Sequence, residues 1–296
     1  PPDTNYTDNN VTNGQTYYYK VTARDLAANT SLASNEVSVI PRGVLYVDAA
    51  SGSDATGIGS SASPYETVQY GLAQAANGDT IYVRPGTYLE TLDLGGKWVS
   101  LRSTSGKDVT FLTSNGSGTV ITAETDEESN TEVVGFTIKD ASTGVSIGSD
   151  EEVTIRDCYI TDTNYPIEVY ADNDINLFNI TFGLNGLQAV KMNGENIGYS
   201  SSSVTRTWNI NNLTVNPEGH LYVESSSSNA TATLKIIGNA ELAFNAANQL
   251  EIGGDNSNNR GAIQATGVTF TALDTSTSWG GIFFRNYADD ASCLID

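Results

Sequence analysis

The middle of the chain contains three aligned segments of ten residues: TEVVGFTIKD (131–140), VTIRDCYITD (153–162) and INLFNITFGL (175–184). Their starts are 22 residues apart, since 153 − 131 = 22 and 175 − 153 = 22. Val133, Ile155 and Leu177 form one apolar column of this alignment. Apolar residues alternate with polar ones in each segment, which is typical of a β-strand with one buried side.

A second set of alternating residues repeats at the same offset. Val145 and Ile147 align with Ile167 and Val169, and the alignment places Lys191 in the next copy. One such unit cannot bury its apolar side alone, but stacked units place like residues on like residues. The repeat therefore predicts an all-β parallel β-helix with about 22 residues per coil in its best-ordered part. Leucine-rich repeats would show their Leu/Asn consensus, and propeller blades need roughly 40 residues.

The composition excludes several classes of function. The 296 residues carry 14 basic and 35 acidic side chains, which gives a formal net charge of −21. No apolar run approaches the roughly 20 residues of a membrane span, and the acidic excess argues against a nucleic-acid partner. His220 is the only histidine, which excludes a multi-histidine metal site or a His-based triad. Cys158 and Cys293 are too far apart in sequence to indicate a metal knuckle or redox pair.

The first forty residues differ from the rest. Alternation from Tyr17 to Ala23 predicts one strand, and Val37 begins a second. The stretch resembles the C-terminal half of a fibronectin type III module, with these matches: Gly14, Thr16, Tyr17, Tyr19, Val21 and Ala23 in its penultimate strand, and Ser34-Asn35-Glu36-Val37 in its last. The earlier strands of that family are missing here. We therefore expect residues 1–41 to form a partial module that is poorly packed or leans on its neighbour, and residues 42–296 to form the β-helix, both as parts of a longer protein.

Residues 45–90 predict a strand, a Gly/Ser loop, a short helix over 67–76 and another strand. The helix would cap the open end of the first coil. From here the chain resembles right-handed parallel β-helix proteins of the pectate-lyase-like class, through these residues: Tyr46-Val47-Asp48, Gly52-Ser53-Asp54, Pro64-Tyr65, Thr67-Val68, Ala73, Gly78-Asp79-Thr80-Ile81 and Pro85-Gly86-Thr87-Tyr88. The resemblance implies a secreted or cell-surface protein but no single activity, because that class includes lyases, hydrolases, adhesins and structural spikes.

Acidic residues form two candidate sites. Glu128, Asp150 and Asp172 share one column at the 22-residue offset, and stacked coils lie about 4.8 Å apart. Such a ladder of carboxylates would repel itself unless a hard cation such as Ca²⁺ bound to it, or unless the side chains splayed into water. Asp140 and Asp162 share another column, and two carboxyl groups about 5 Å apart suit retaining glycoside hydrolysis. The alternative is that both are surface turn residues.

Aromatic residues suggest a glycan-binding surface. Tyr165, Tyr170 and Trp208 fall near strand ends or turns, where their rings could stack on sugars, although tyrosine is also simply common in strands. We therefore expect a monomeric, glycan-interacting or adhesin-like surface module, with a polysaccharide as its partner. A polysaccharide lyase or glycoside hydrolase acting on an acidic polymer is the alternative, and a structural stalk is the second. Without a bound cation, the charge of −21 would repel an acidic substrate.

Overall fold

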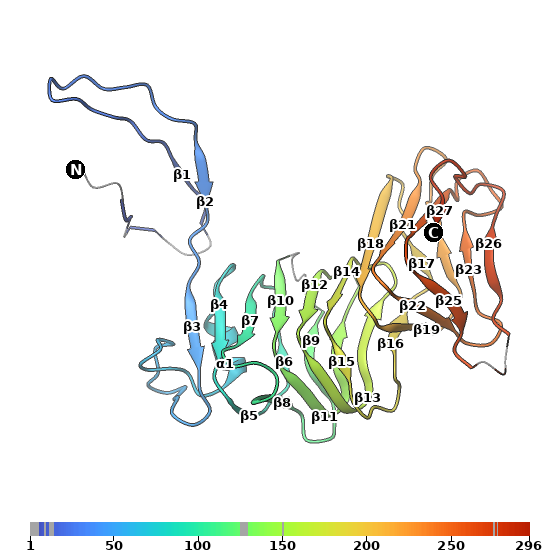
Figure 1. Cartoon of the computed structure of the whole chain (residues 1–296), viewed down its shortest axis with the longest axis horizontal. Coiled ribbons are helices and arrows are strands. Elements are labelled where there is room, and N and C mark those ends of the chain that lie inside the picture. Colours follow the sequence, from blue (N-terminus) through green and yellow to red (C-terminus); the bar gives the residue numbers. More distant parts are fainter. Residues whose placement is uncertain are drawn as a thin grey trace.

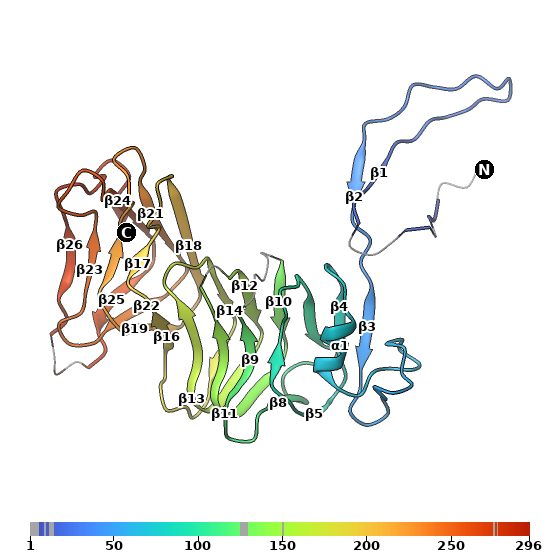
Figure 2. The same cartoon turned by 180° about the vertical axis from the view of Figure 1, so that it is seen from behind.

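The fold is described from a computed structural model, in residues 6–8, 10, 11, 15–124, 130–149, 151–274, 276 and 278–296. These residues form a parallel β-solenoid preceded by a β-hairpin that projects away from it (Figures 1 and 2). The solenoid is built of three sheets, each of which takes one strand from successive coils. The predicted all-β solenoid is therefore confirmed.

The first sheet runs the length of the solenoid. Its strands, in spatial order, are β3 (Val44–Val47), β4 (Thr80–Val83), β7 (Ser100–Ser103), β10 (Thr131–Val134), β12 (Val153–Arg156), β14 (Ile175–Phe178), β18 (Val204–Ile210), β21 (Ala232–Ile237), β24 (Gly261–Ala265) and β27 (Leu294–Ile295). Every neighbouring pair is parallel.

The second and third sheets complete the coils. The second contains β5 (Gly86–Leu89), β6 (Leu92–Asp93), β8 (Thr110–Thr113), β9 (Thr119–Ala123), β11 (Thr137–Ile147), β13 (Tyr159–Tyr170), β15 (Thr181–Phe182), β16 (Val190–Asn193), β19 (Thr214–Pro217), β22 (Glu241–Phe244) and β25 (Thr269–Ala272). The third contains β17 (Asn196–Ile197), β20 (Leu221–Val223), β23 (Gln249–Ile252) and β26 (Gly281–Phe284). Long β11 and β13 bend between the faces of the solenoid (Figure 1).

The core consists of rows of apolar side chains that stack along the solenoid. Val133 pairs with Ile155, which pairs with Leu177, and all three are fully buried. The intervening residues, such as Thr154, point outward because successive side chains of a strand alternate between its faces. The offset of these pairs is 22 residues, whereas Ile175 pairs with Trp208, an offset of 208 − 175 = 33, where a longer loop intervenes.

One prediction about register is wrong. The alignment at an offset of 22 placed Lys191 beside Val169, but in the structure Lys191 pairs with Glu168 and Met192 pairs with Val169. The coil between β13 and β16 is one residue longer than the repeat predicts. Because a shift of one residue moves every side chain to the other face of a strand, Lys191 lies outside the core and Met192 lies inside it.

The predicted capping helix is present as α1 (Val68–Gln74). The Thr67 side chain accepts a hydrogen bond from the Tyr70 backbone N–H, which satisfies one of the free donors at the helix start. Val68 and Leu72 are buried, and the helix packs against β3, β4 and β6. It therefore covers the apolar residues of the first coil.

The hairpin pairs β1 (Tyr17–Tyr19) with β2 (Val37–Val39) in antiparallel register. Most of its apolar side chains are exposed to solvent, and Val37 is 64% exposed. This agrees with the expectation of a poorly packed segment. Gly14, one of the residues that carry the resemblance to a fibronectin type III module, lies outside the described residues.

Candidate carbohydrate-binding surface

Two of the three predicted sugar-contacting residues lie on the surface. Tyr165 and Tyr170 both belong to β13, and their exposures are 38% and 42%. The third prediction is wrong, because Trp208 is fully buried in β18. Trp208 pairs with Ile175 on one side and Ile236 on the other, so its indole belongs to an inward-facing row of the core. It cannot contact a glycan without unfolding of that coil.

Tyr165 takes part in a cluster of charged side chains. The Lys191 Nζ lies 4.5 Å from the centre of the Tyr165 ring. The same ammonium is 2.7 Å from Glu168 Oε1 and 3.2 Å from Glu218 Oε1. Glu168 comes from β13, Lys191 from β16 and Glu218 from the residue after β19, so three successive coils build the cluster. The cation beneath the ring holds Tyr165 in a defined orientation.

The charged groups of this cluster form ion pairs with one another. The Lys191 side chain is only 15% exposed. Burial would lower the pKa of Lys191, but the hydrogen bonds from its ammonium to Glu168 and Glu218 outweigh burial and raise the pKa. The Thr143 hydroxyl also donates to Glu168 Oε2, at 3.1 Å. The cluster thus presents a fixed aromatic ring and ionised groups of both signs, which is an arrangement suited to binding a polar ligand.

Tyr170 lies beside a small pocket on the same sheet. The pocket has a volume of about 270 Å³ and is lined by Glu124, Gly148, Ser149 and Tyr170. Glu124 Oε1 accepts a hydrogen bond from the Ser146 hydroxyl, at 3.1 Å. Tyr170 follows Glu168 by two residues, so both side chains leave the same face of β13. The two tyrosines therefore bracket one polar surface of the second sheet.

The predicted carboxylate pair, Asp140 and Asp162, stands in neighbouring coils. Lys139 pairs with Thr161 and Ala141 with Thr163, which places the two aspartates at equivalent positions. Both have left-handed backbone conformations, with φ of 50° and 54°. Asp140 Oδ2 lies 3.5 Å from Lys139 Nζ, and Asp162 Oδ2 accepts from the Thr161 hydroxyl at 3.1 Å. Since Asp and Asn tolerate this conformation best among non-glycine residues, the bend itself accounts for the residue type.

The predicted metal ladder is described only at Asp172, because Glu128 and Asp150 lie outside the described residues. Asp172 Oδ1 accepts hydrogen bonds from the Gly198 backbone N–H at 2.6 Å and from Arg206 Nε at 3.0 Å. Its carboxylate thus already faces a cation of the protein. Within the described part of the chain, no three His, Cys, Asp or Glu side chains gather in a way that could hold a metal ion.

Glu168 and Glu218 were not predicted as site residues. A strict offset of 22 places Val190 opposite Glu168, which hides the ion pair between Glu168 and Lys191. The available signal was the Gly183-Leu184-Asn185-Gly186 stretch, where glycine and asparagine indicate a turn that can absorb an extra residue. A search for charge pairs at an offset of 23 would have found Glu168 and Lys191, but Glu218 lies 218 − 191 = 27 residues after Lys191 and would still have been missed.

Comparisons with known proteins add little to this picture. No protein-family model matches the sequence, and no curated protein matches it. Among solved structures, a pectin methylesterase from carrot is similar, with 12% sequence identity and a TM-score of 0.31, over 82% of this chain and 70% of that one. None of the helices in the described residues is long and apolar enough to cross a membrane. The fold is therefore assigned from strand order and register, and the site from its own geometry.

Proposed function

We propose that this β-solenoid is a carbohydrate-binding, adhesin-like module, and that Tyr165 on the second sheet contacts the sugar. The observation that carries the proposal is the exposed Tyr165 ring held over Lys191, between the carboxylates of Glu168 and Glu218. Sugar rings stack on aromatic faces, and their hydroxyls both donate and accept hydrogen bonds. The cluster offers an aromatic face with charged donors and acceptors around it.

The chemistry of the cluster favours binding over catalysis. To act as the base of a lyase, Lys191 would need an unprotonated amine beside the carbon that loses its proton. The pKa of Lys191 is raised by its hydrogen bonds to Glu168 and Glu218, so its amine stays protonated near neutral pH. Asp140 and Asp162 have a conformational reason to be aspartates. No observation in the described residues specifically favours the lyase or hydrolase alternative.

The proposal also covers the domain organisation of the chain and its location. The exposed hairpin of β1 and β2 supports a partial fibronectin type III-like spacer over residues 1–41, followed by the β-helix over 42–296. Spacers of this kind hold binding modules away from a surface, so we propose a secreted or cell-surface location and a polysaccharide or surface glycan as the partner. The acidic charge of −21 favours an uncharged glycan over a polyanion.

The test is binding of the full chain to a panel of soluble and insoluble polysaccharides, measured by glycan array and pull-down. Tyr165→Ala should weaken binding at least tenfold, since a stacked ring is lost, whereas Tyr165→Phe should retain most of it. Tyr199→Ala is the matched control, because Tyr199 is also exposed but lies in the loop after β17. Equal binding by Tyr165→Ala and the parent chain would contradict the proposal.

An assay for reducing ends and unsaturated products on the same panel, with and without Ca²⁺, addresses the enzymatic alternative. We expect no product. Product formation that is lost in Asp140→Asn or Asp162→Asn would replace the binding proposal with a catalytic one.

A further inference from the structure

A second pocket lies on the first sheet, at the junction between the hairpin and the solenoid. Its volume is about 280 Å³, and its walls include Arg42 from the linker, Trp98, Asn130 and Thr154. This is close to the lower end of small-molecule pockets, which start at about 300 Å³. The pocket is on a different sheet from the Tyr165 cluster, so it is a separate candidate site.

Trp98 forms a rigid aromatic wall of this pocket. A Cβ atom at Gly78 would come within 2.8 Å of the indole, so the ring can lie there only because residue 78 is glycine. The Gly78 backbone N–H donates to the Trp98 carbonyl at 2.7 Å, which fixes the two strands' ends together. The Arg42 guanidinium lies 5.1 Å from the ring centre. The indole is therefore oriented before any ligand arrives.

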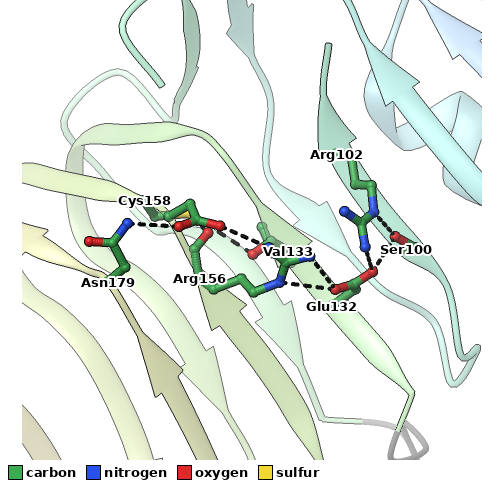
Figure 3. Close-up of polar contacts among 8 residues, drawn as sticks. Ser100, Arg102, Glu132, Val133, Arg156, Cys158 and Asn179 are labelled. Carbon is green, nitrogen blue, oxygen red and sulfur yellow. Dashed lines mark hydrogen bonds and ion pairs between the residues drawn. The ribbon is translucent and has the colours of Figure 1, made fainter. Parts of the chain in front are cut away.

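Charges on the neighbouring wall are paired within the protein. Figure 3 shows Glu132 between Arg102 and Arg156. The Ser100 hydroxyl donates to Glu132 Oε1 at 2.6 Å, and Arg156 Nη2 donates to Oε2 at 3.2 Å. Burial would raise the pKa of Glu132, but these hydrogen bonds and the two guanidiniums outweigh burial and lower the pKa. Both carboxylate oxygens are occupied, and Arg156 Nη1 also pairs with Asp157 Oδ2 at 2.8 Å. The two guanidiniums and two carboxylates therefore balance one another, and this ion cluster forms a wall of the pocket.

Uncharged polar side chains extend from the pocket along the sheet. Thr154 pairs with Glu132 on one side and with Asn176 on the other, and Asn176 pairs with Asn209. The side chains of Asn130, Thr154, Asn176 and Asn209 make no hydrogen bond to any described residue. Neighbouring strands lie about 4.8 Å apart, so Thr154, Asn176 and Asn209 form a regular row of hydroxyl and amide groups, and Asn130 lies beside this row in the pocket.

We propose that this face binds an uncharged, linear oligosaccharide, with one sugar in the Trp98 pocket and the next sugars along the row from Thr154 to Asn209. Hydroxyls of the sugar match the free amide and hydroxyl groups, which can both donate and accept. An anionic chain fits poorly, because Glu132 and Asp157 neutralise the guanidiniums of Arg102 and Arg156 and the whole chain carries −21. The site goes beyond the proposed function, since none of its residues belongs to the Tyr165 cluster.

The test is isothermal titration of the full chain with cellohexaose, xylohexaose and mannohexaose as neutral probes and hexagalacturonate as the anionic probe. We expect at least one neutral probe to bind more tightly than hexagalacturonate. Thr154→Val should weaken that binding about fivefold, as for one lost hydrogen bond, and Thr154→Val with Asn176→Ala should weaken it further. Both positions are on the surface, so the variants are expected to fold.

Trp98→Phe adds a spectroscopic measurement. The neutral probe should change the fluorescence of the parent chain, and this change should be lost in Trp98→Phe. Tyr165→Ala is the control that separates the two sites. If the neutral probes bind and only Tyr165→Ala weakens them, this inference is wrong and the proposed function stands. Binding by no neutral probe, or tighter binding of hexagalacturonate, would also overturn it.

Discussion

Single residues at the strand bends show how backbone conformation selects side chains. In the described part of the chain, six Asn or Asp residues have positive φ: Asn115, Asp140, Asp157, Asp162, Asn179 and Asn212. Some of them interact along the stack, since Asn179 Nδ2 donates to Asp157 Oδ1 at 2.7 Å and Asn239 Nδ2 donates to Asn212 Oδ1 at 3.4 Å. Their side chains satisfy local partners while the backbone turns. Acidic columns in this solenoid can therefore arise from turn geometry without any catalytic purpose.

Asp162 provides a test of this reading. Asp162→Val should destabilise the protein by about 1–2 kcal/mol, because a β-branched residue is strained at a φ of 54°. Asp162→Asn keeps the preference for that conformation and should change stability by less than about 0.5 kcal/mol. Urea unfolding of the three proteins gives the comparison. Equal destabilisation by both substitutions would point to a role for the charge instead.

Glu132 is expected to make stability depend on pH. Its pKa is lowered in the folded protein, mainly because the Ser100 hydrogen bond and the Arg102 and Arg156 guanidiniums outweigh the opposing effect of burial. A lowered pKa means that this contribution is full above the ordinary value of 4.5 and is lost as pH falls through the folded value. Glu132→Gln should therefore be less stable than the parent at pH 7, and the difference should shrink by pH 3. Urea midpoints at several pH values measure this, and a constant difference would contradict the assignment.

At the scale of the elements, stacking of like residues holds neighbouring strands together. Ile155 lies between Val133 and Leu177 in the core row of β10, β12 and β14. Ile155→Ala should cost about 2–5 kcal/mol, because it leaves a cavity in a fully buried row. Thr154→Ala is the adjacent control on the outer face and should cost less than about 0.5 kcal/mol. Similar losses at both positions would mean that the alternation of faces is wrong.

The spacing between elements also decides which side chains reach the surface. One additional residue between β13 and β16 turns Lys191 outward and Met192 inward. The cluster with Tyr165, Glu168 and Glu218 exists only because of that insertion. Loop length between repeats is thus the feature of this chain that creates a site on an otherwise regular surface.

At the scale of the whole molecule, the hairpin is expected to contribute little to the stability of the solenoid. Most side chains of residues 15–40 are exposed, and the junction is tied down by the Gly43 backbone N–H, which donates to Asp79 Oδ1 at 2.6 Å. Removal of residues 1–41 should shift the melting temperature of the remaining chain by only a few degrees. Differential scanning calorimetry of both chains tests this. A large drop would mean that the hairpin packs on the solenoid in solution.

The acidic charge of the molecule leads to a prediction about calcium. If Glu128, Asp150 and Asp172 bind Ca²⁺, then the melting temperature should rise with Ca²⁺ relative to EDTA, and Asp150→Asn with Asp172→Asn should abolish the rise. Asp172→Asn alone should lower stability in EDTA as well, since Asp172 accepts two hydrogen bonds from Arg206. An unchanged melting temperature of the parent chain with Ca²⁺ would contradict the prediction that calcium binds. Differential scanning fluorimetry with both additives is sufficient.

Much of the fold follows from the sequence because a solenoid is a local, periodic structure. Val133, Ile155 and Leu177 recur at a fixed offset, so their stacking can be read from the spacing alone. The capping helix follows from its own amphipathic pattern, although it ends at Gln74 because Ala75 is extended. Trp208 shows that the sequence pattern does not predict which face of a strand is buried. Its alternation with Ile210 places both on one face, but nothing in the sequence says that this face is the inner one.

The sequence by itself determined the repeat and the class of fold, because alternation and spacing are properties of neighbouring residues. Only the tertiary structure decided which charges meet. Glu168, Lys191 and Glu218 come from three coils, and so do Arg102, Glu132 and Arg156. Which side chains become neighbours across coils depends on the length of every loop between them, and a single added residue exchanges the buried and exposed faces of a strand.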